Sequence, residues 1–151
     1  MAYVLNAAIA ATDLLRAATS SLPHARLVPL DQGLSFMPIS DDLFDAVTER
    51  SAAPLPGFWR LPAGFERTLA DWSRSGPVAY VEAEYFGGTG EQHAAAWHQG
   101  HLIFGPLHIE EGQRWPEGGS PISQALRHLG AQAGTAFDEF DAVGLQHHRH
   151  T

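Results

Sequence analysis

The sequence predicts an α+β fold: a single domain spanning residues 1–151, with an antiparallel β-sheet meander and helices packed mainly on one face. Three observations support this prediction. A chain of 151 residues is long enough to bury one hydrophobic core. Three strand-like segments follow one another in the second half of the chain. Amphipathic segments with helix-capping residues occur before and after these strands.

The first half begins with residues 3–11 (YVLNAAIAA), which have the pattern of a buried strand. Thr12 or Asp13 can cap a short helix that follows this strand and that Pro23 ends. The segments RLVPL and GLSFMPI then predict two short strands. The turn DQG lies between them, and aspartate and glycine are typical turn residues.

Two helices and a loop are expected in the middle of the chain. Ser40 is a favourable N-cap for DDLFDAVTER, in which the acidic first turn and the final Arg50 complement the helix dipole. The Pro- and Gly-rich stretch SAAPLPGFWRLPAG predicts an ordered surface loop, because it holds the adjacent aromatic residues Phe58 and Trp59. Residues 64–74 fit a helix with apolar side chains at intervals of four and three residues.

The second half begins with three segments of strand character, PVAYVEAEYF, EQHAAAWH and HLIFGPLHI. Gln99 and Gly100 separate the last two and predict a tight hairpin, so the three strands should form an antiparallel meander. Ser120 then opens the helix SPISQALRHLG, which has proline at its first position and glycine just past its end. The segment FDEFDAVGL predicts a last helical turn.

The composition narrows the range of functions. The chain has no cysteine, which excludes disulfides, thiolate nucleophiles and cysteine metal sites. All nine basic residues are arginine and the formal net charge is −8, so we expect no nucleic-acid partner. No apolar run approaches the ~20 residues that a membrane-spanning helix needs, so no membrane partner is expected either. The N-terminal segment lacks the basic start of a secretory signal, which predicts a cytoplasmic protein.

The stretch YVEAEYFGGTGEQ, residues 80–92, places two glutamates on one face of a predicted strand. At the rise of a strand, Glu82 and Glu84 would stand ~7 Å apart. Paired carboxylates can act as general acid and base, or contribute to a cation site. They can equally belong to a solvated sheet face or dock against a basic partner. The glycines that follow lack the spacing of a dinucleotide-binding loop and predict a turn or a bulge.

Two groups among the nine histidines could bind a metal: His98 and His101 flank the predicted hairpin turn, and His147, His148 and His150 lie near the C-terminus. Neutral imidazole is a common zinc ligand. The helix motif HExxH is absent, however, and no acid is spaced with these histidines in a recognisable ligand pattern. We therefore expect no native metal site and no cofactor, and only adventitious nickel or zinc binding by the C-terminal histidines.

The sequence holds no recognisable catalytic constellation, so we do not expect an enzyme. The serine elbow GxSxG is absent, and Ser120 is better explained as a helix cap. Asp138 and Asp141 form a second acidic patch, either solvated or part of a docking surface. Trp59 could anchor an interface because aromatic residues dominate binding hot spots, although packing in a core is the commoner role of tryptophan.

The segments AYVEAEYFGGTGEQHAAAW, SPISQALRHLG and DEFDAVGLQHHRH together resemble a family of small bacterial proteins. Its members are immunity proteins of polymorphic-toxin and interbacterial-competition systems. The resemblance covers residues 77–151, about half of the chain. It implies inhibition by direct binding, in which a cognate toxin is held in an inactive complex without any chemistry. It does not imply which residues touch the toxin.

The leading hypothesis is therefore an immunity protein that neutralises a cognate, basic toxin by non-catalytic binding. An acidic inhibitor associates quickly with a basic toxin because opposite charges steer the encounter. The partner-binding residues expected are acidic and aromatic: Glu82, Glu84, Trp59, Asp138 and Asp141. Two alternatives stay open, a small metal-dependent hydrolase that uses Glu82 and Glu84, and an adaptor or structural domain of a larger assembly.

Overall fold

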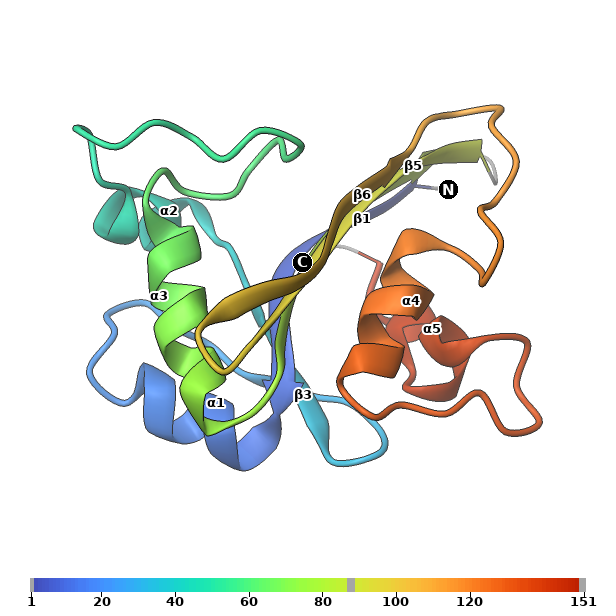
Figure 1. Ribbon diagram of the computed structural model, residues 1–151, viewed down its shortest axis with the longest axis horizontal. Coiled ribbons are helices and arrows are strands. Elements are labelled where there is room, and N and C mark those ends of the chain that lie inside the picture. Colours follow the sequence, from blue (N-terminus) through green and yellow to red (C-terminus); the bar gives the residue numbers. More distant parts are fainter. Residues whose placement is uncertain (1, 87–88, 150–151) are drawn as a thin grey trace.

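A six-stranded antiparallel sheet lies between two layers of helices in the computed structural model, which describes residues 2–86 and 89–149 (Figure 1). The strand order is β2-β3-β1-β4-β5-β6. The strands are β1 (Ala2–Ala11), β2 (Val28–Pro29), β3 (Leu34–Pro38), β4 (Val78–Phe86), β5 (Thr89–His98) and β6 (His101–Ile109). The predicted α+β class is confirmed, and β4, β5 and β6 form the predicted meander.

The helices cover both faces of the sheet. They are α1 (Thr12–Thr19), α2 (Asp41–Val47), α3 (Phe65–Trp72), α4 (Pro121–His128) and α5 (Glu139–Ala142), with short 3-10 turns η1 (Ser73–Ser75) and η2 (Leu145–His147). In Figure 1, α1, α2 and α3 lie on one side of the sheet, and α4 and α5 lie on the other. The expectation that helices pack mainly on one face is thereby corrected.

The central strands explain the two-sided packing. Successive side chains of a strand point to opposite faces, and in β1 both sets are apolar. Leu5, Ala7 and Ile9 join the core under α4, whereas Ala8 and Ala10 join the core under α1, α2 and α3. A strand that is apolar on both faces must be covered twice, because otherwise one apolar face would remain in water.

Local signals place the element boundaries. The hydroxyl groups of Ser40 and Ser120 each accept a hydrogen bond from the backbone N–H three residues later, at 3.2 Å, which confirms both predicted N-caps. The predicted cap at Thr12 or Asp13 is wrong, because α1 begins at Thr12 without a side-chain cap. The Thr12 hydroxyl instead bonds the Gly33 carbonyl at 3.1 Å.

Turns join the three strands of the meander. Gln99 and Gly100 both have positive φ, 53° and 82°, as the predicted tight turn between β5 and β6 requires. The turn or bulge predicted after Phe86 falls on Gly87 and Gly88, which lie outside the described residues. Among the helices of the described chain, none has the length and apolar character needed to cross a membrane.

Candidate functional site

Four polar side chains form a row across the sheet, on the face that carries α1, α2 and α3. Asn6 of β1 pairs with Glu82 of β4, Glu82 pairs with His93 of β5, and His93 pairs with His108 of β6. Residues paired across antiparallel strands share a face. A buried carboxylate and a buried imidazole are costly in an otherwise apolar core, so this row marks the candidate site.

Glu82 is fully buried and holds the loop that crosses the sheet in front of it. Its Oε1 accepts a hydrogen bond from the backbone N–H of Trp59 at 2.6 Å. Its Oε2 accepts from the backbone N–H of Arg60 at 2.7 Å and from the hydroxyl of Tyr80 at 2.9 Å. Three donors on one carboxylate stabilise its buried position and fix the backbone of the loop.

The Arg60 side chain fixes the other side of this loop. Its Nε donates to the carbonyl of Ile39 at 3.1 Å, and its guanidinium lies 5.3 Å above the ring of Phe44 and pairs with Asp41. The loop is thus tied to β4 through Glu82 and to α2 through Arg60.

The prediction that Glu82 contacts a partner is therefore wrong, and this residue instead anchors the loop. The sequence suggested a solvated acidic face, but this side chain has no exposed surface with which to touch a partner. Two of its three hydrogen-bond partners are backbone groups more than twenty residues earlier in the chain, which no local pattern could indicate. Burial raises the pKa of Glu82 above its ordinary 4.5, and the hydrogen bonds from Trp59, Arg60 and Tyr80 oppose that shift.

Trp59 stands at the junction of two surface hollows. One, of about 280 Å³, is lined by Trp59, Glu84, Phe86, Gly90, Glu91 and Glu111; we call it the Trp59 pocket. A second, of about 320 Å³, is lined by Asn6, Trp59, Arg60 and Glu84. The Trp59 residue is 49% exposed although its backbone N–H is held by Glu82. The predictions for Trp59 and Glu84 thus fall on one exposed, acidic and aromatic surface.

His93 lies at the inner edge of this surface and is almost completely buried. Its ring is stacked on that of His108, with centroids 4.2 Å apart and planes inclined by 10°, and the Trp59 ring meets it edge-on at 4.4 Å. Neither ring nitrogen of His93 makes a hydrogen bond of normal geometry among the described residues, although the Gly57 backbone and the Glu91 carboxylate both lie near the ring. Burial, followed by the charge of His108, lowers the pKa of His93 below its ordinary value, which favours the neutral imidazole.

Glu91 completes a cluster with the two histidines. Its Oε2 lies 3.7 Å from Nε2 of His93 and 3.8 Å from Nε2 of His108. One ligand atom from each of the three residues lies within 4.8 Å of the others. The expectation of no native metal site did not consider this group, which combines residues of two strands.

The sequence did not indicate that His108 pairs with His93, because the β5–β6 ladder is irregular. A regular ladder from the confirmed Gln99-Gly100 turn would place Pro106 opposite His93. Register shifts between Ala94 and Trp97 move the pairing by two residues and bring His108 there instead. Glu91 and His93 were visible in the sequence as residues of one strand face, so only their partner across the hairpin was hidden.

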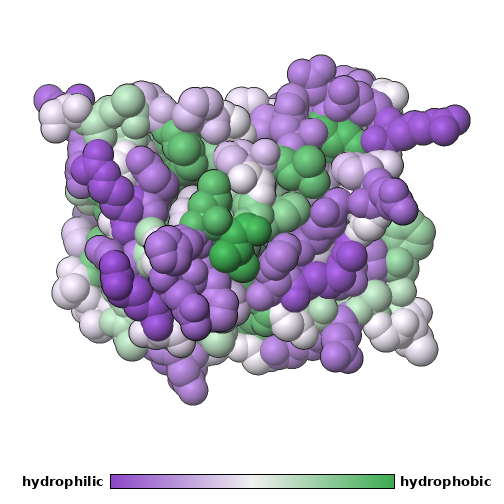
Figure 2. Space-filling view, viewed as in Figure 1, coloured by the Kyte–Doolittle hydropathy of each residue, from purple (hydrophilic) through white to green (hydrophobic). Residues whose placement is uncertain are grey.

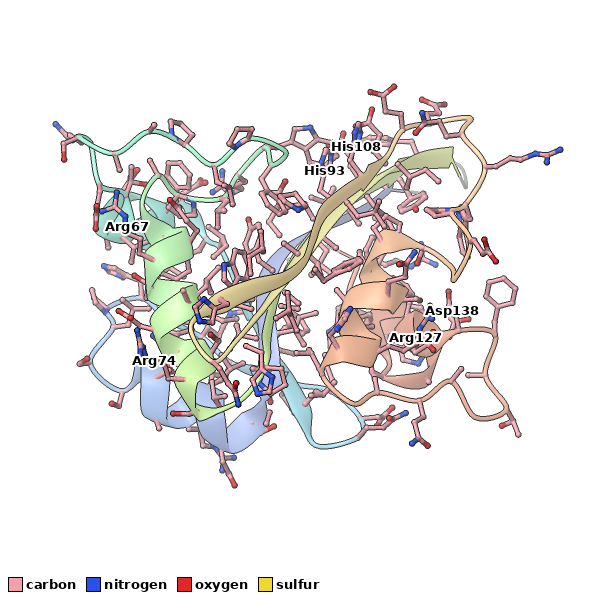
Figure 3. The ribbon with its side chains drawn as sticks, in the orientation of Figure 1. Arg67, Arg74, His93, His108, Arg127 and Asp138 are labelled. Atoms are coloured by element: carbon pink, nitrogen blue, oxygen red, sulfur yellow. The ribbon has the colours of Figure 1, made fainter. Side chains whose placement is uncertain are left out.

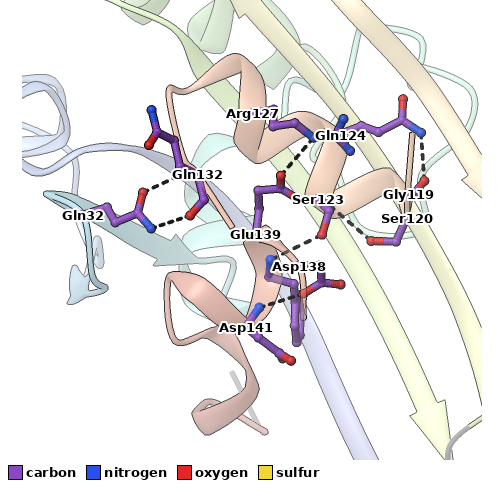
Figure 4. A network of polar contacts seen from close by, with 11 residues as sticks. Gln32, Gly119, Ser120, Ser123, Gln124, Arg127, Gln132, Asp138, Glu139 and Asp141 are labelled. Atoms are coloured by element: carbon purple, nitrogen blue, oxygen red, sulfur yellow. Dashed lines mark hydrogen bonds and ion pairs between the residues drawn. The ribbon is translucent and has the colours of Figure 1, made fainter. Parts of the chain in front are cut away.

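Asp138 and Asp141 lie away from Trp59, on the side of the sheet covered by α4 and α5. Figure 3 shows Asp138 near Arg127, with the sheet between it and the His93–His108 pair. Asp138 caps α5 by accepting a hydrogen bond from the Asp141 N–H at 2.9 Å (Figure 4). Burial, and next the charge of Asp138, raise the pKa of Asp141. One docking surface cannot include both these aspartates and Trp59.

The polar network around α5 has a clear structural role. The Ser123 hydroxyl accepts a hydrogen bond from the Phe140 N–H at 3.3 Å, and Arg127 pairs with Glu139 at 3.2 Å (Figure 4). These contacts fasten a four-residue helix to α4. The network therefore accounts for the terminal acidic segment without a ligand.

The chain was compared with protein-family models, curated proteins and solved structures. No protein-family model matches the chain, and no curated protein or solved structure matches it significantly.

Proposed function

We propose that this protein is an immunity protein that neutralises a cognate, basic bacterial toxin in the cytoplasm by direct, non-catalytic binding. The docking surface in this proposal is the Trp59 pocket with its rim of carboxylates. The observation that carries it is the half-exposed Trp59, whose backbone is fixed by the buried Glu82 and whose surroundings include Glu84, Glu91 and Glu111.

An exposed tryptophan on a fixed backbone suits a binding anchor. Tryptophan is enriched among hot-spot residues, and an anchor that is already ordered loses little conformational entropy on binding. Because Glu82 and Arg60 hold both sides of the loop, Trp59 needs no rearrangement of its backbone to meet a partner. An aromatic ring beside carboxylates also matches an arginine or lysine side chain, through cation–π and ionic contacts.

Charge supports a basic partner. The formal net charge of −8 would attract a basic toxin over a distance, and the three glutamates of the pocket would orient it at contact. Asp138 and Asp141 are left out of the proposed surface because α5 uses them internally and the sheet separates them from Trp59.

The hydrolase alternative requires both Glu82 and Glu84, and Glu82 is not suited to acid-base catalysis. Glu82 already accepts three hydrogen bonds from the chain itself, so it is not placed to exchange a proton with a substrate. Glu84 remains exposed in the lining of the Trp59 pocket and is assigned here to partner contact.

The proposal is tested by co-expression with the toxin candidate encoded by the adjacent gene, followed by affinity capture and measurement of the dissociation constant. Trp59→Ala should weaken binding by about 2 kcal/mol or more, roughly 30-fold. Trp115→Ala is the matched control, since Trp115 is 47% exposed but lies outside the pocket. Glu84→Arg should slow association and reduce its dependence on salt.

Two results would count against this assignment. A stoichiometric complex that tolerates Trp59→Ala as well as Trp115→Ala would place the interface elsewhere. If the adjacent gene product is neither toxic alone nor bound by this protein, the immunity function itself is wrong for that pair.

An adaptor function is favoured by a different feature, the outer surface of β6. This strand lies at the edge of the sheet and exposes Leu102 and Ile103. Figure 2 shows hydrophobic residues gathered near the centre of that face. Exposed apolar groups on an edge strand favour association with another chain. Sedimentation of the wild type and of Leu102→Arg would show whether the protein self-associates through this strand.

A further inference from the structure

A metal site is the strongest unassigned feature of the molecule, and it does not depend on the proposed immunity function. We propose that Glu91, His93 and His108 bind a single divalent transition-metal ion, of which zinc is the best match. The three ligand atoms come from neighbouring positions of β5 and β6 and lie within 4.8 Å of one another.

The buried imidazole of His93, whose Nε2 faces Glu91 without a hydrogen bond of normal length, is the observation that points to a ligand. Its side chain is 7% exposed, and neither ring nitrogen makes a hydrogen bond of normal geometry among the described residues: the Gly57 backbone lies near the ring, and Glu91 Oε2 stands 3.7 Å from Nε2. Buried polar groups are nearly always satisfied, because an unpaired donor or acceptor loses its hydration without compensation. A metal ion at Nε2 would satisfy the nitrogen that faces Glu91.

The spacing of the ligand atoms is close to that of a zinc site. With bonds of ~2.0–2.1 Å in a tetrahedral arrangement, two ligand atoms lie about 3.3 Å apart. Glu91 Oε2 stands 3.7 Å from Nε2 of His93 and 3.8 Å from Nε2 of His108, so contraction by a few tenths of an ångström suffices for these two pairs.

Metal binding requires one of the two stacked imidazole rings, His93 or His108, to rotate. Because a ligand nitrogen coordinates in the plane of its ring, two parallel imidazoles cannot share one ion, and one of them must turn. His108 is the exposed partner and can turn, whereas His93 is held between the Trp59 ring and the sheet. Glu110 Oε1 lies 3.8 Å from Nε2 of His108 and is in reach as a fourth ligand or as an orienting group.

The donor set selects the class of metal. Two imidazole nitrogens and a carboxylate suit zinc and its neighbours in the transition series, whereas magnesium and calcium prefer oxygen ligands alone. Glu91 also lines the Trp59 pocket, so the ion would sit at the wall of that hollow. A coordination position left open there would face solvent or a bound partner.

The test is calorimetric titration of Zn²⁺ into the protein of residues 1–151 after treatment with a chelator. The C-terminal histidines could bind zinc by themselves, so the titrations use a background carrying His147→Gln, His148→Gln and His150→Gln. We expect this background protein to bind one equivalent of zinc. His108→Gln and Glu91→Gln should each weaken that binding at least 10-fold.

The same hairpin offers a matched control. His98 and His101 also face each other across β5 and β6, yet they belong to no cluster of potential ligands among the described residues. The double variant His98→Gln, His101→Gln should bind zinc as the background protein does. Thermal melts of the zinc-free variants establish that each is folded before it is titrated.

Any of four results would overturn the proposal. One is loss of all zinc binding in the background protein, which would assign it to the C-terminal histidines. The second is unchanged affinity in both His108→Gln and Glu91→Gln. The third is an equal loss of affinity in the His98→Gln, His101→Gln control. As an independent readout, zinc should shift the imidazole NMR resonances of His93 in the background protein, and unperturbed resonances would also contradict the site.

Discussion

Replacement of Glu82 by glutamine tests whether this carboxylate fixes the backbone of the loop that contains Trp59 and Arg60. The N–H groups of Trp59 and Arg60 approach different carboxylate oxygens, Oε1 and Oε2. Glutamine offers one carbonyl oxygen and one NH₂ group. Whichever way the amide is placed, one of the two backbone donors must face another donor.

The magnitude follows from that single mismatch. A buried donor left without an acceptor costs about 1–3 kcal/mol, and removal of a buried charge offsets part of the loss. We expect Glu82→Gln to lower the free energy of unfolding by about 1–3 kcal/mol. Glu84→Gln is the matched control on the same strand and face, and because Glu84 is exposed its effect should stay within about 0.5 kcal/mol.

Urea denaturation followed by tryptophan fluorescence measures both variants under the same conditions. An unchanged slope against urea would show that the variants unfold from a similarly compact native state. Limited proteolysis should cut the loop at residues 51–60 faster in Glu82→Gln than in the wild type. Equal stability and equal proteolysis in Glu82→Gln and Glu84→Gln would refute the anchoring role.

Two further predictions concern pH and the β5–β6 register. Because burial raises the pKa of Glu82, its contribution to stability is full below about 4.5 and is lost as the pH rises through the folded-state pKa. The stability advantage of the wild type over Glu82→Gln should therefore shrink as the pH rises from 4 toward neutrality; an advantage that grows instead would mean that the folded protein lowers this pKa. At Gly105, φ is +75° and an added Cβ would lie 2.4 Å from the Ala94 carbonyl oxygen. Gly105→Ala should therefore destabilise the protein by about 2 kcal/mol or more in urea denaturation, through both backbone strain and a clash. Gly112 has a similar φ of +82° but no atom within 4 Å, so Gly112→Ala should cost only about 1 kcal/mol, and equal losses would show that the contact with Ala94 is unimportant.

Short-range signals in the sequence predicted the elements well. Ser40 and Ser120 cap helices because their hydroxyls can reach an N–H three residues away. Gln99 and Gly100 form the β5–β6 turn with positive φ at both residues, as a two-residue turn of type I′ requires. These interactions join residues close in the chain, so the residue types and their spacing carry the information.

The placement of helices required the assembled sheet. The residues of β1 are apolar on both faces, which already indicated a buried strand but not the side on which each helix lies. The assignment depends on β1 lying between β3 and β4, with helices of the first half on one side and those of the last third on the other. No local pattern specifies the face of the sheet on which a helix packs, even where the helix follows its strand directly, as α1 follows β1.

The sequence by itself determined the α+β class, the meander, the helix caps at Ser40 and Ser120, and the acidic, cysteine-free composition. Only the tertiary structure separated Glu82 from Glu84, making one a buried anchor and the other a surface group. It alone also brought His108 beside Glu91 and His93, through a bulged register. The reason is physical. Strand alternation places both glutamates on one face, but burial depends on which distant segment packs against each position. Here the backbone of Trp59 and Arg60 packs against Glu82, whereas Glu84 stays exposed.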